Sequence, residues 1–407
     1  MNVVTDITIT QQAEEYLSAL AEELEIPESR YDQAVESYKS LGAWFHRPAS
    51  TVRNFGPDVF VQGSFRLGTA IRPLNDAEQY DVDSVCELKK LSKSDVTQSQ
   101  LKDLLGDEIK AYRAAKNMSK PVRPGRRCWT LEYADGAQFH MDIVPALSNA
   151  KGQRLLLEAR GLDTQWAGTA IAITDNETWN YSILSEDWPR SNPRGYAEWF
   201  KGRMAGAFEK RRRVLAESRR ASVESIPDYK VRTPLQSAIM ILKRHRDIMF
   251  NGRSDLRPIS IIITTLAAHA YSGEETIGRA LVSILARMDQ FIQHDGNKFI
   301  IWNPTDPLEN FADKWEKYPE RAEAFQQWLT RARSDFWQAA RLAAHSSVAS
   351  TLAPRIGHLL AERAEARMGH GRGIGRPTLL RSASPVPAAP LAFPSKPRVP
   401  SKPQGFA

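Results

Sequence analysis

Three aspartates lie inside runs of residues that are typical of buried β-strands. Asp81 and Asp83 belong to the run Asp81–Leu88, and Asp142 belongs to the run Gln138–Val144. Side chains two residues apart on a strand leave the same face, so Asp81 and Asp83 point in one direction. Burying a carboxylate among apolar residues costs free energy unless it has a partner. We therefore expect a fold that brings all three carboxylates to a shared cation.

A glycine and a serine directly follow the short apolar strand Val59–Gln62. Gly63 lets the backbone approach a phosphate closely, and Ser64 offers a hydroxyl and an N–H to phosphate oxygens. Further along, Arg127–Tyr133 and Gln138–Val144 flank an Asp-Gly turn. Two β-rich runs around such a turn predict a hairpin, with Asp142 in its second arm.

The rest of the chain is mostly helical in pattern. Apolar spacing predicts a helix over 11–45 that is broken at Pro27, and a helix over 92–113. Pro234–Met249 has proline in its first turn, and Ile259–Tyr271 is apolar almost all round, which favours a central buried helix. We expect an irregular, Trp-rich stretch over 147–199 and mostly helix from 196 to 368.

The positive net charge is concentrated at one end. The chain has 55 Lys and Arg against 48 Asp and Glu, and the stretch from Arg355 onward holds nine of the former and only two of the latter. Residues 1–354 are therefore balanced, which argues against a long nucleic acid as substrate. From Pro377 onward, 8 of 31 residues are proline. This composition predicts a disordered tail.

Compartment signals are few. The sequence has no apolar run of the roughly 18–20 residues that a membrane span needs, and no signal-peptide pattern at its start. Cys86 and Cys128 cannot form a disulfide framework, lie in no zinc motif, and are expected to be buried free thiols. These features favour a cytoplasmic protein.

The combination of groups predicts phosphoryl chemistry. Three carboxylates and triphosphate oxygens are hard ligands of the kind that Mg²⁺ or Mn²⁺ prefers. Two such ions, about 3.5–4 Å apart, serve in-line displacement at phosphorus. One activates the attacking hydroxyl and the other holds the triphosphate and the leaving pyrophosphate.

At these residues the chain resembles the nucleotidyltransferase superfamily of poly(A) polymerase, oligoadenylate synthase and cyclic GMP-AMP synthase. It is most similar to the bacterial CD-NTases, the cGAS/DncV-like enzymes of CBASS anti-phage systems. Besides QGSFRLGT, YDVD and HMDIV, the resemblance includes Ser191–Phe200, Pro234–Asp247, Pro258–Leu266 and Asn303–Phe311, and it extends over roughly residues 40–330.

The resemblance implies a role for each matching residue. Asp81, Asp83 and Asp142 would form the catalytic, metal-binding triad. Gln62, Gly63 and Ser64 would hold the donor triphosphate, assisted by Arg66; Lys243 and Ser260 would reach the same phosphates; and Asp306 would face a nucleobase or ribose. The alternatives are a solvated lysine, a helix N-cap and a turn residue for Lys243, Ser260 and Asp306 respectively. His140 and His245 are interpreted as structural or solvent-facing.

Two further segments carry hypotheses. The run Lys210–Arg213 indicates either a solvated helix face or a nucleotide- or RNA-binding patch. The tail ends at Ala407, and the resemblance implies that a ubiquitin-activating/conjugating-like enzyme joins this carboxyl to a target. The alternative is an inert tail.

We expect an α+β protein: a polymerase-beta-like nucleotidyltransferase α/β lobe, a helical second lobe and a disordered C-terminal tail. The expected divisions are N-terminal helices bridging the lobes (1–50), the nucleotidyltransferase core (51–200), the helical lobe (201–370) and the tail (371–407). The expected activity is synthesis of a cyclic di- or trinucleotide second messenger from nucleoside triphosphates including ATP. The messenger would activate a downstream effector in anti-phage defence. A linear RNA-tailing enzyme and a catalytically silent scaffold acting through its tail are the alternatives.

Overall fold

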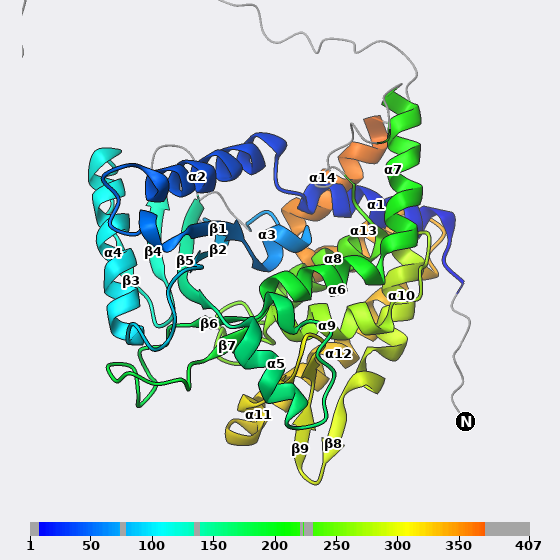
Figure 1. Ribbon diagram of the computed structural model, residues 1–407. Helices are drawn as coiled ribbons and strands as arrows, with labels where there is room; N and C mark the ends of the chain where they lie inside the picture. Colours follow the sequence, from blue (N-terminus) through cyan, green and yellow to red (C-terminus); the bar gives the residue numbers. More distant parts are fainter. Residues whose placement is uncertain (1–7, 74–78, 134–138, 220–222, 224–230, 371–407) are drawn as a thin grey trace, which may run out of the picture. The chain divides into compact units, whose positions relative to one another are not determined.

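A mixed β-sheet carries the aspartate strands in the computed structural model (Figure 1). The model describes residues 8–73, 79–133, 139–219, 223 and 231–370; the tail predicted over 371–407, including Ala407, lies outside them. Along one path the strands are ordered β1 (Pro57–Val61), β2 (Tyr80–Leu88), β5 (Phe139–Ser148), β4 (Trp129–Tyr133) and β3 (Arg123–Pro124). The hairpin arms predicted around the Asp-Gly turn are β4 and β5, which pair antiparallel; the turn itself is not described.

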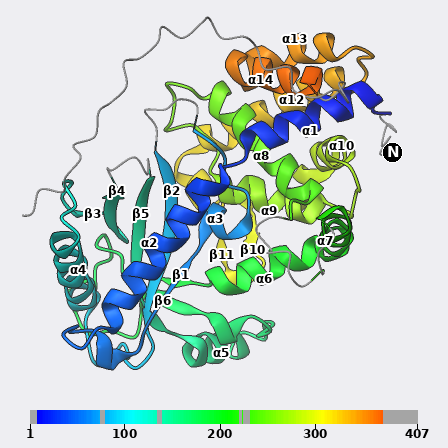
Figure 2. The same cartoon turned by 90° about the horizontal axis from the view of Figure 1, so that it is seen from above.

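One strand pair departs from the antiparallel pattern. β2 and β5 run parallel along nine residues of each, while β1 pairs antiparallel with the other edge of β2. Apolar side chains of β2 and β5 alternate into a core shared with α2 (Glu28–His46) and α4 (Gln98–Ala115), which includes Val82, Met141 and Ile143. Figure 2 shows α2 crossing this sheet. The polar residues that alternate with these apolar ones along β2 and β5 therefore lie on the opposite face of the sheet.

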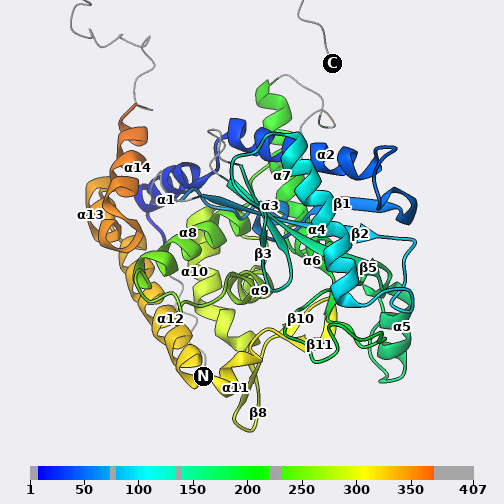
Figure 3. The ribbon, with the colours of Figure 1, turned by 90° about the vertical axis from the view of Figure 1, so that its left-hand side faces the viewer.

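A second core belongs to the helices. It joins residues of α1 (Gln11–Leu24), α6 (Pro193–Arg203), α8 (Pro234–Met249), α9 (Ser260–Ala270), α10 (Ile277–Arg287), α12 (Pro319–Ala340) and α13 (His345–Ile356). Figure 3 shows these helices beside the sheet. α1 packs on α8, α10 and α13, whereas α2 packs on β1 and α4, so the N-terminal helices contribute to different cores. The helix break predicted at Pro27 is confirmed.

The remaining elements are short or peripheral. They are α3 (Gly63–Leu67), α5 (Ala150–Glu158), β6 (Ile171–Ile173), β7 (Arg190–Ser191), α7 (Ala205–Arg219), the hairpin pairs β8 (Gln293–Asp295)/β9 (Lys298–Ile300) and β10 (Trp302–Asn303)/β11 (Asp306–Asn310), α11 (Lys314–Lys317) and α14 (His358–His370). The helices predicted at Pro234 and Ile259 are confirmed as α8 and α9. Within the described residues, no helix combines the length and apolar character needed to cross a membrane.

Three local predictions were wrong. The helix expected from residue 92 begins at Gln98, because Thr97 and Gln100 form a capping box there. The stretch expected to be irregular over 147–199 contains α5, β6, β7 and α6, most of them too short to give a periodic pattern. Cys86 is buried as expected, but Cys128 is half-buried because it lies in the turn that precedes β4.

A buried carboxylate connects two loops beside the sheet. Asp175 accepts from Arg126 Nε at 2.7 Å and from Arg127 Nε at 2.8 Å, and its backbone N–H donates to Gln98. Burial disfavours ionisation of Asp175, but the two arginine hydrogen bonds outweigh it and lower the pKa of this carboxyl to about 2.

We predict an acid-sensitive contribution to stability from Asp175. Because its pKa in the folded state lies below the unfolded value, the contribution is complete above about pH 4 and is lost as pH falls toward 2. Both arginines are partly exposed, so we expect only about 1–2 kcal/mol. Thermal unfolding of Asp175→Asn and wild type should differ at pH 6 and converge near pH 2; a constant difference would contradict this prediction.

We predict opposite effects of alanine at two helical glycines. An added Cβ at Gly106 in α4 would lie 2.3 Å from the Trp129 ring, whereas one at Gly202 in α6 would meet nothing within 4 Å. Alanine is favoured over glycine in a helix by about 1 kcal/mol. Gly202→Ala should therefore leave the unfolding temperature unchanged or raise it. Gly106→Ala should lower the unfolding temperature and reduce the free energy of unfolding by about 1–3 kcal/mol, because the Trp129 ring must shift.

Candidate active site

The parallel pairing of β2 and β5 brings four polar side chains together. In its register Asp83 lies opposite Asp142, and Asp81 lies opposite His140. Each strand contributes residues two apart, so all four leave the same face of the sheet. The structure thus brings together the three aspartates that the sequence pattern singled out, and adds a histidine that was interpreted as structural or solvent-facing.

Asp83 lies against the glycine turn. Gln62 N–H donates to the Asp83 carbonyl at 2.8 Å, which joins the end of β1 to β2. Gly63 has φ of 59°, and a Cβ there would lie 2.3 Å from Asp83 Oδ2. Only glycine satisfies both the left-handed backbone and this close approach. Burial, followed by the charges of Asp81 and Asp142, raises the pKa of Asp83 to about 7.

The two polar residues that β5 contributes, Asp142 and His140, each have a defined partner. Thr130 Oγ1 donates to Asp142 Oδ1 at 2.6 Å, which orients that carboxylate. His140 Nε2 lies 3.4 Å from Asp81 Oδ1, and this contact raises the pKa of the imidazole. The signal for His140 was available in the sequence, since it lies two residues before Asp142 and must share its face.

These residues fit a divalent cation. Asp81, His140 and Asp142 each offer one ligand atom within 4.8 Å of the others. Burial, and then the charges of Asp81 and Asp142, disfavour ionisation of Asp83, and a cation among these carboxylates would offset both effects. Carboxylate oxygens are ligands for Mg²⁺ and Mn²⁺, and imidazole is tolerated better by Mn²⁺.

A cavity of about 460 Å³ adjoins Asp81. Ser64, Asp81, Lys243 and Ser260 all line it, so it unites predicted residues from β2, α3, α8 and α9. Its other walls include four arginines, Arg72, Arg244, Arg246 and Arg257. A cavity lined by these cations and by the Asp81 carboxylate suits a triphosphate with bound divalent cations.

Lys243 is one of three buried cations that line this cavity, with Arg244 and Arg246. Its Nζ donates to the Thr69 carbonyl at 2.9 Å, and Thr69 N–H donates in turn to the Ser64 carbonyl. Burial, then the nearby Arg246 charge, lowers the pKa of Lys243 to about 8. The ammonium therefore stays largely protonated at neutral pH. Ser260 begins α9 and accepts from Arg246 Nη1 at 2.8 Å.

Two predicted residues lie elsewhere. Arg66 lines a separate cavity of about 290 Å³, which Glu198 also lines. Arg66 Nη2 lies 3.7 Å from Glu198 Oε1. Asp306 is buried at the start of β11, where it pairs with Arg190 Nε at 3.1 Å and accepts from the Leu308 N–H. Neither lines the cavity beside Asp81. His245, interpreted as structural or solvent-facing, is buried and contacts Asp335.

Comparison with known proteins agrees with this geometry. The family model "Cyclic GMP-AMP synthase DncV-like, nucleotidyltransferase domain" matches residues 57–145, which hold Gly63, Ser64 and all three aspartates. A c-di-GMP synthase of Roseivirga ehrenbergii is 28% identical over 80% of this chain and 79% of its own length. The cyclic dinucleotide synthase CdnG of Bradyrhizobium diazoefficiens is 25% identical over 74% of this chain and 69% of its own.

Solved structures share the fold. The structure of the Bradyrhizobium diazoefficiens CD-NTase CdnG in complex with GTP superposes with a TM-score of 0.64 at 20% identity, covering 88% of this chain and 99% of that one. This similarity extends through both the sheet and the helical core. The family match across the aspartate strands identifies residues 57–145 as a DncV-like nucleotidyltransferase domain, and the chain shares the fold of a solved bacterial CD-NTase.

Proposed function

We propose that this protein joins nucleoside triphosphates into a cyclic dinucleotide, with guanine nucleotides among its substrates. The observation that carries the proposal is the in-register set Asp81, Asp83 and Asp142 beside the cationic cavity that holds Ser64 and Lys243. The names of the relatives, a c-di-GMP synthase and a cyclic dinucleotide synthase, support guanine and a two-nucleotide ring over the wider range that the sequence left open.

The site would work mainly by positioning and charge neutralisation. Asp81, Asp83 and Asp142 would hold two divalent ions, Mg²⁺ or Mn²⁺; bound there, the ions would supply charge neutralisation at the phosphates and a more acidic attacking hydroxyl. Thr130 holds one carboxylate in place by its hydrogen bond to Asp142, and Gly63 allows Asp83 and the turn to meet.

The chain's own donors would bind the donor nucleotide. The Ser64 hydroxyl, Lys243 and Ser260 face one cavity and would contact triphosphate oxygens, together with the Gln62–Gly63 turn. Arg66 and Asp306 would act from outside that cavity, Arg66 through α3 and Asp306 by fixing Arg190. A ribose hydroxyl would attack an α-phosphate with loss of pyrophosphate, and a second transfer would close the ring.

The biological setting is also part of the proposal. The reaction would occur in the cytoplasm, where nucleoside triphosphates are available. The cyclic product would activate a downstream effector in anti-phage defence, as the resemblance to CBASS enzymes implies. Ala407, which lies outside the described residues, would be joined to a target by a ubiquitin-activating/conjugating-like enzyme.

The activity is tested with labelled nucleotides. Wild type and Asp81→Ala/Asp83→Ala are incubated with radiolabelled GTP and ATP and with Mg²⁺ or Mn²⁺, then treated with phosphatase and analysed by mass spectrometry. We expect a phosphatase-resistant cyclic dinucleotide that the double variant fails to make. Labelled ends that phosphatase removes, or incorporation only with added RNA, would instead identify a linear polymerase.

We predict that Gly63→Ala abolishes activity while a matched glycine variant does not. Gly56 and Gly63 both have φ near +60°, so alanine costs each about 1 kcal/mol or somewhat more in backbone strain. Only at position 63 would the methyl group collide with the Asp83 carboxylate; at Gly56 it meets the Lys90 stem at 3.4 Å. We expect kcat/KM to fall at least 100-fold in Gly63→Ala and less than three-fold in Gly56→Ala. Equal losses would refute the contact argument.

A further inference from the structure

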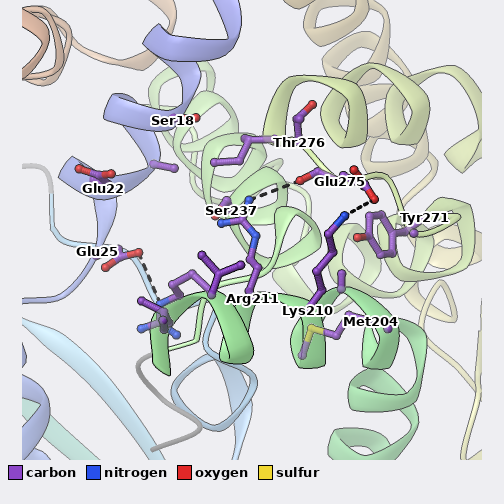
Figure 4. A pocket seen from close by; sticks show the side chains of 18 of the residues that line it. Ser18, Glu22, Glu25, Met204, Lys210, Arg211, Ser237, Tyr271, Glu275 and Thr276 are labelled. Atoms are coloured by element: carbon purple, nitrogen blue, oxygen red, sulfur yellow. Dashed lines mark hydrogen bonds and ion pairs between the residues drawn. The ribbon is translucent and has the colours of Figure 1, made fainter. Parts of the chain in front are cut away.

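A third and larger cavity, of about 1040 Å³, lies among the helices (Figure 4). Its walls come from α1, from the junction of α6 and α7, from the segment before α8, from the start of α10 and from Arg367 of α14. Among the described residues, none lines both this cavity and the one beside Asp81. The proposed transfer reaction therefore leaves it without a role.

The wall of this cavity carries an excess of positive charge. Among its described residues, five are cationic and three are acidic: Arg203, Lys210, Arg211, Arg232 and Arg367 against Glu22, Glu25 and Glu275. Two cations are closely paired, Lys210 with Glu275 at 2.5 Å and Arg367 with Glu22 at 2.9 Å. The excess positive charge belongs to Arg203, Arg211 and Arg232.

Arg203 and Arg211 have no carboxylate partner within the part of the chain that the structure describes. Arg203 donates to the backbone carbonyls of Ala268 and Tyr271, at 2.8 and 3.0 Å. Arg211 makes one long contact, of 3.5 Å, to the Glu275 carbonyl. In Figure 4, Lys210 and Arg211 rise from α7 toward Glu275. Guanidinium groups held in this way keep their charge available for an anion, and favour phosphate or carboxylate.

The same cavity has an apolar side. Met204, Val214 and the ring of Tyr271 contribute to its wall, and Val214 is 57% exposed although it is aliphatic. A cavity that combines apolar surface with a few charged groups suits a small organic ligand rather than a bare ion. Its volume is ample for a nucleotide. The run Lys210–Arg213, which the sequence left ambiguous, thus contributes two of its residues to a ligand-sized site.

Arg232 connects this cavity to the end of α3. Its Nη1 donates to the Gly68 carbonyl at 3.4 Å, and its Nε lies 3.6 Å from Glu25 Oε1. Gly68 ends the short helix α3, which begins at Gly63. Both contacts of Arg232 are long, so an anion in the cavity would compete for this guanidinium and release the end of α3.

We propose that this cavity binds an organic phosphate of nucleotide size, and that the bound anion alters nucleotidyl transfer by drawing Arg232 away from Gly68. The binding step stands on the cavity alone, whereas the effect on transfer rests on the proposed function. The two parts are measured separately.

Binding is measured by isothermal titration calorimetry of the full chain in EDTA, where the carboxylate site lacks its cations. The probes are GTP, cyclic di-GMP and inorganic pyrophosphate. Lys210→Ala/Arg211→Ala is compared with wild type and with Arg213→Ala, which removes an exposed cation of α7 that does not line the cavity. We expect at least one probe to bind, at least ten-fold more weakly to the double variant and within two-fold of wild type to Arg213→Ala.

The outcomes separate the sources of the ligand. Binding of cyclic di-GMP would identify a product site, binding of GTP a substrate-sensing site, and binding of pyrophosphate alone a site for the phosphate group only, which would overturn the organic part of the proposal. Absence of binding by all three probes, or equal binding by the double variant, would overturn it entirely. For transfer, the bound probe should change the initial rate at least three-fold in wild type and not in the double variant; an equal rate change in both would refute the effect of this cavity on transfer.

Discussion

The parallel pairing of β2 with β5 is the constraint on which the site depends. A shift of one residue in this register would send Asp83 and Asp142 to opposite faces, because side chains alternate along a strand. The register is fixed on the other face by Val82, Met141 and Ile143, which pack under α2 and α4. The apolar core thus aligns the carboxylates, although none of its residues takes part in chemistry.

Helix α8 couples the helical core to the turn at Gly63 and Ser64. Gln236 donates to the Leu67 carbonyl at 2.8 Å, and Lys243, seven residues later on the same face, donates to the Thr69 carbonyl. The N–H groups of Thr69 and Ala70 donate to the Ser64 carbonyl. A capping box at Thr233 fixes where α8 starts, and therefore where both donors fall. Elements far apart in the sequence thus set the position of one short turn.

Much of the site was predictable because its residues follow local rules. Period-two spacing gave the common face of Asp81 and Asp83, and the Gly-Ser pair after a strand indicated the turn. Spacing alone could not place Arg66 or Asp306, because both depend on tertiary partners, Glu198 and Arg190, that come from distant segments. The short elements between residues 147 and 199 escaped prediction for a similar reason: pairing with β5, and not periodicity, makes β6 a strand. The hydrogen bond from Thr130 to Asp142 could not be predicted without the register of the β4–β5 hairpin.

The crowding of carboxylates around Asp83 has a consequence for how the protein exists before it meets a cation. Burial and the charges of Asp81 and Asp142 raise the pKa of Asp83, which favours its protonated form over three ionised neighbours. Protonation of Asp83 removes one of the three negative charges, and so lowers the free-energy cost of holding the three carboxyl groups together without a cation. Binding of a cation at the proposed site would therefore release a proton from Asp83 into the solvent.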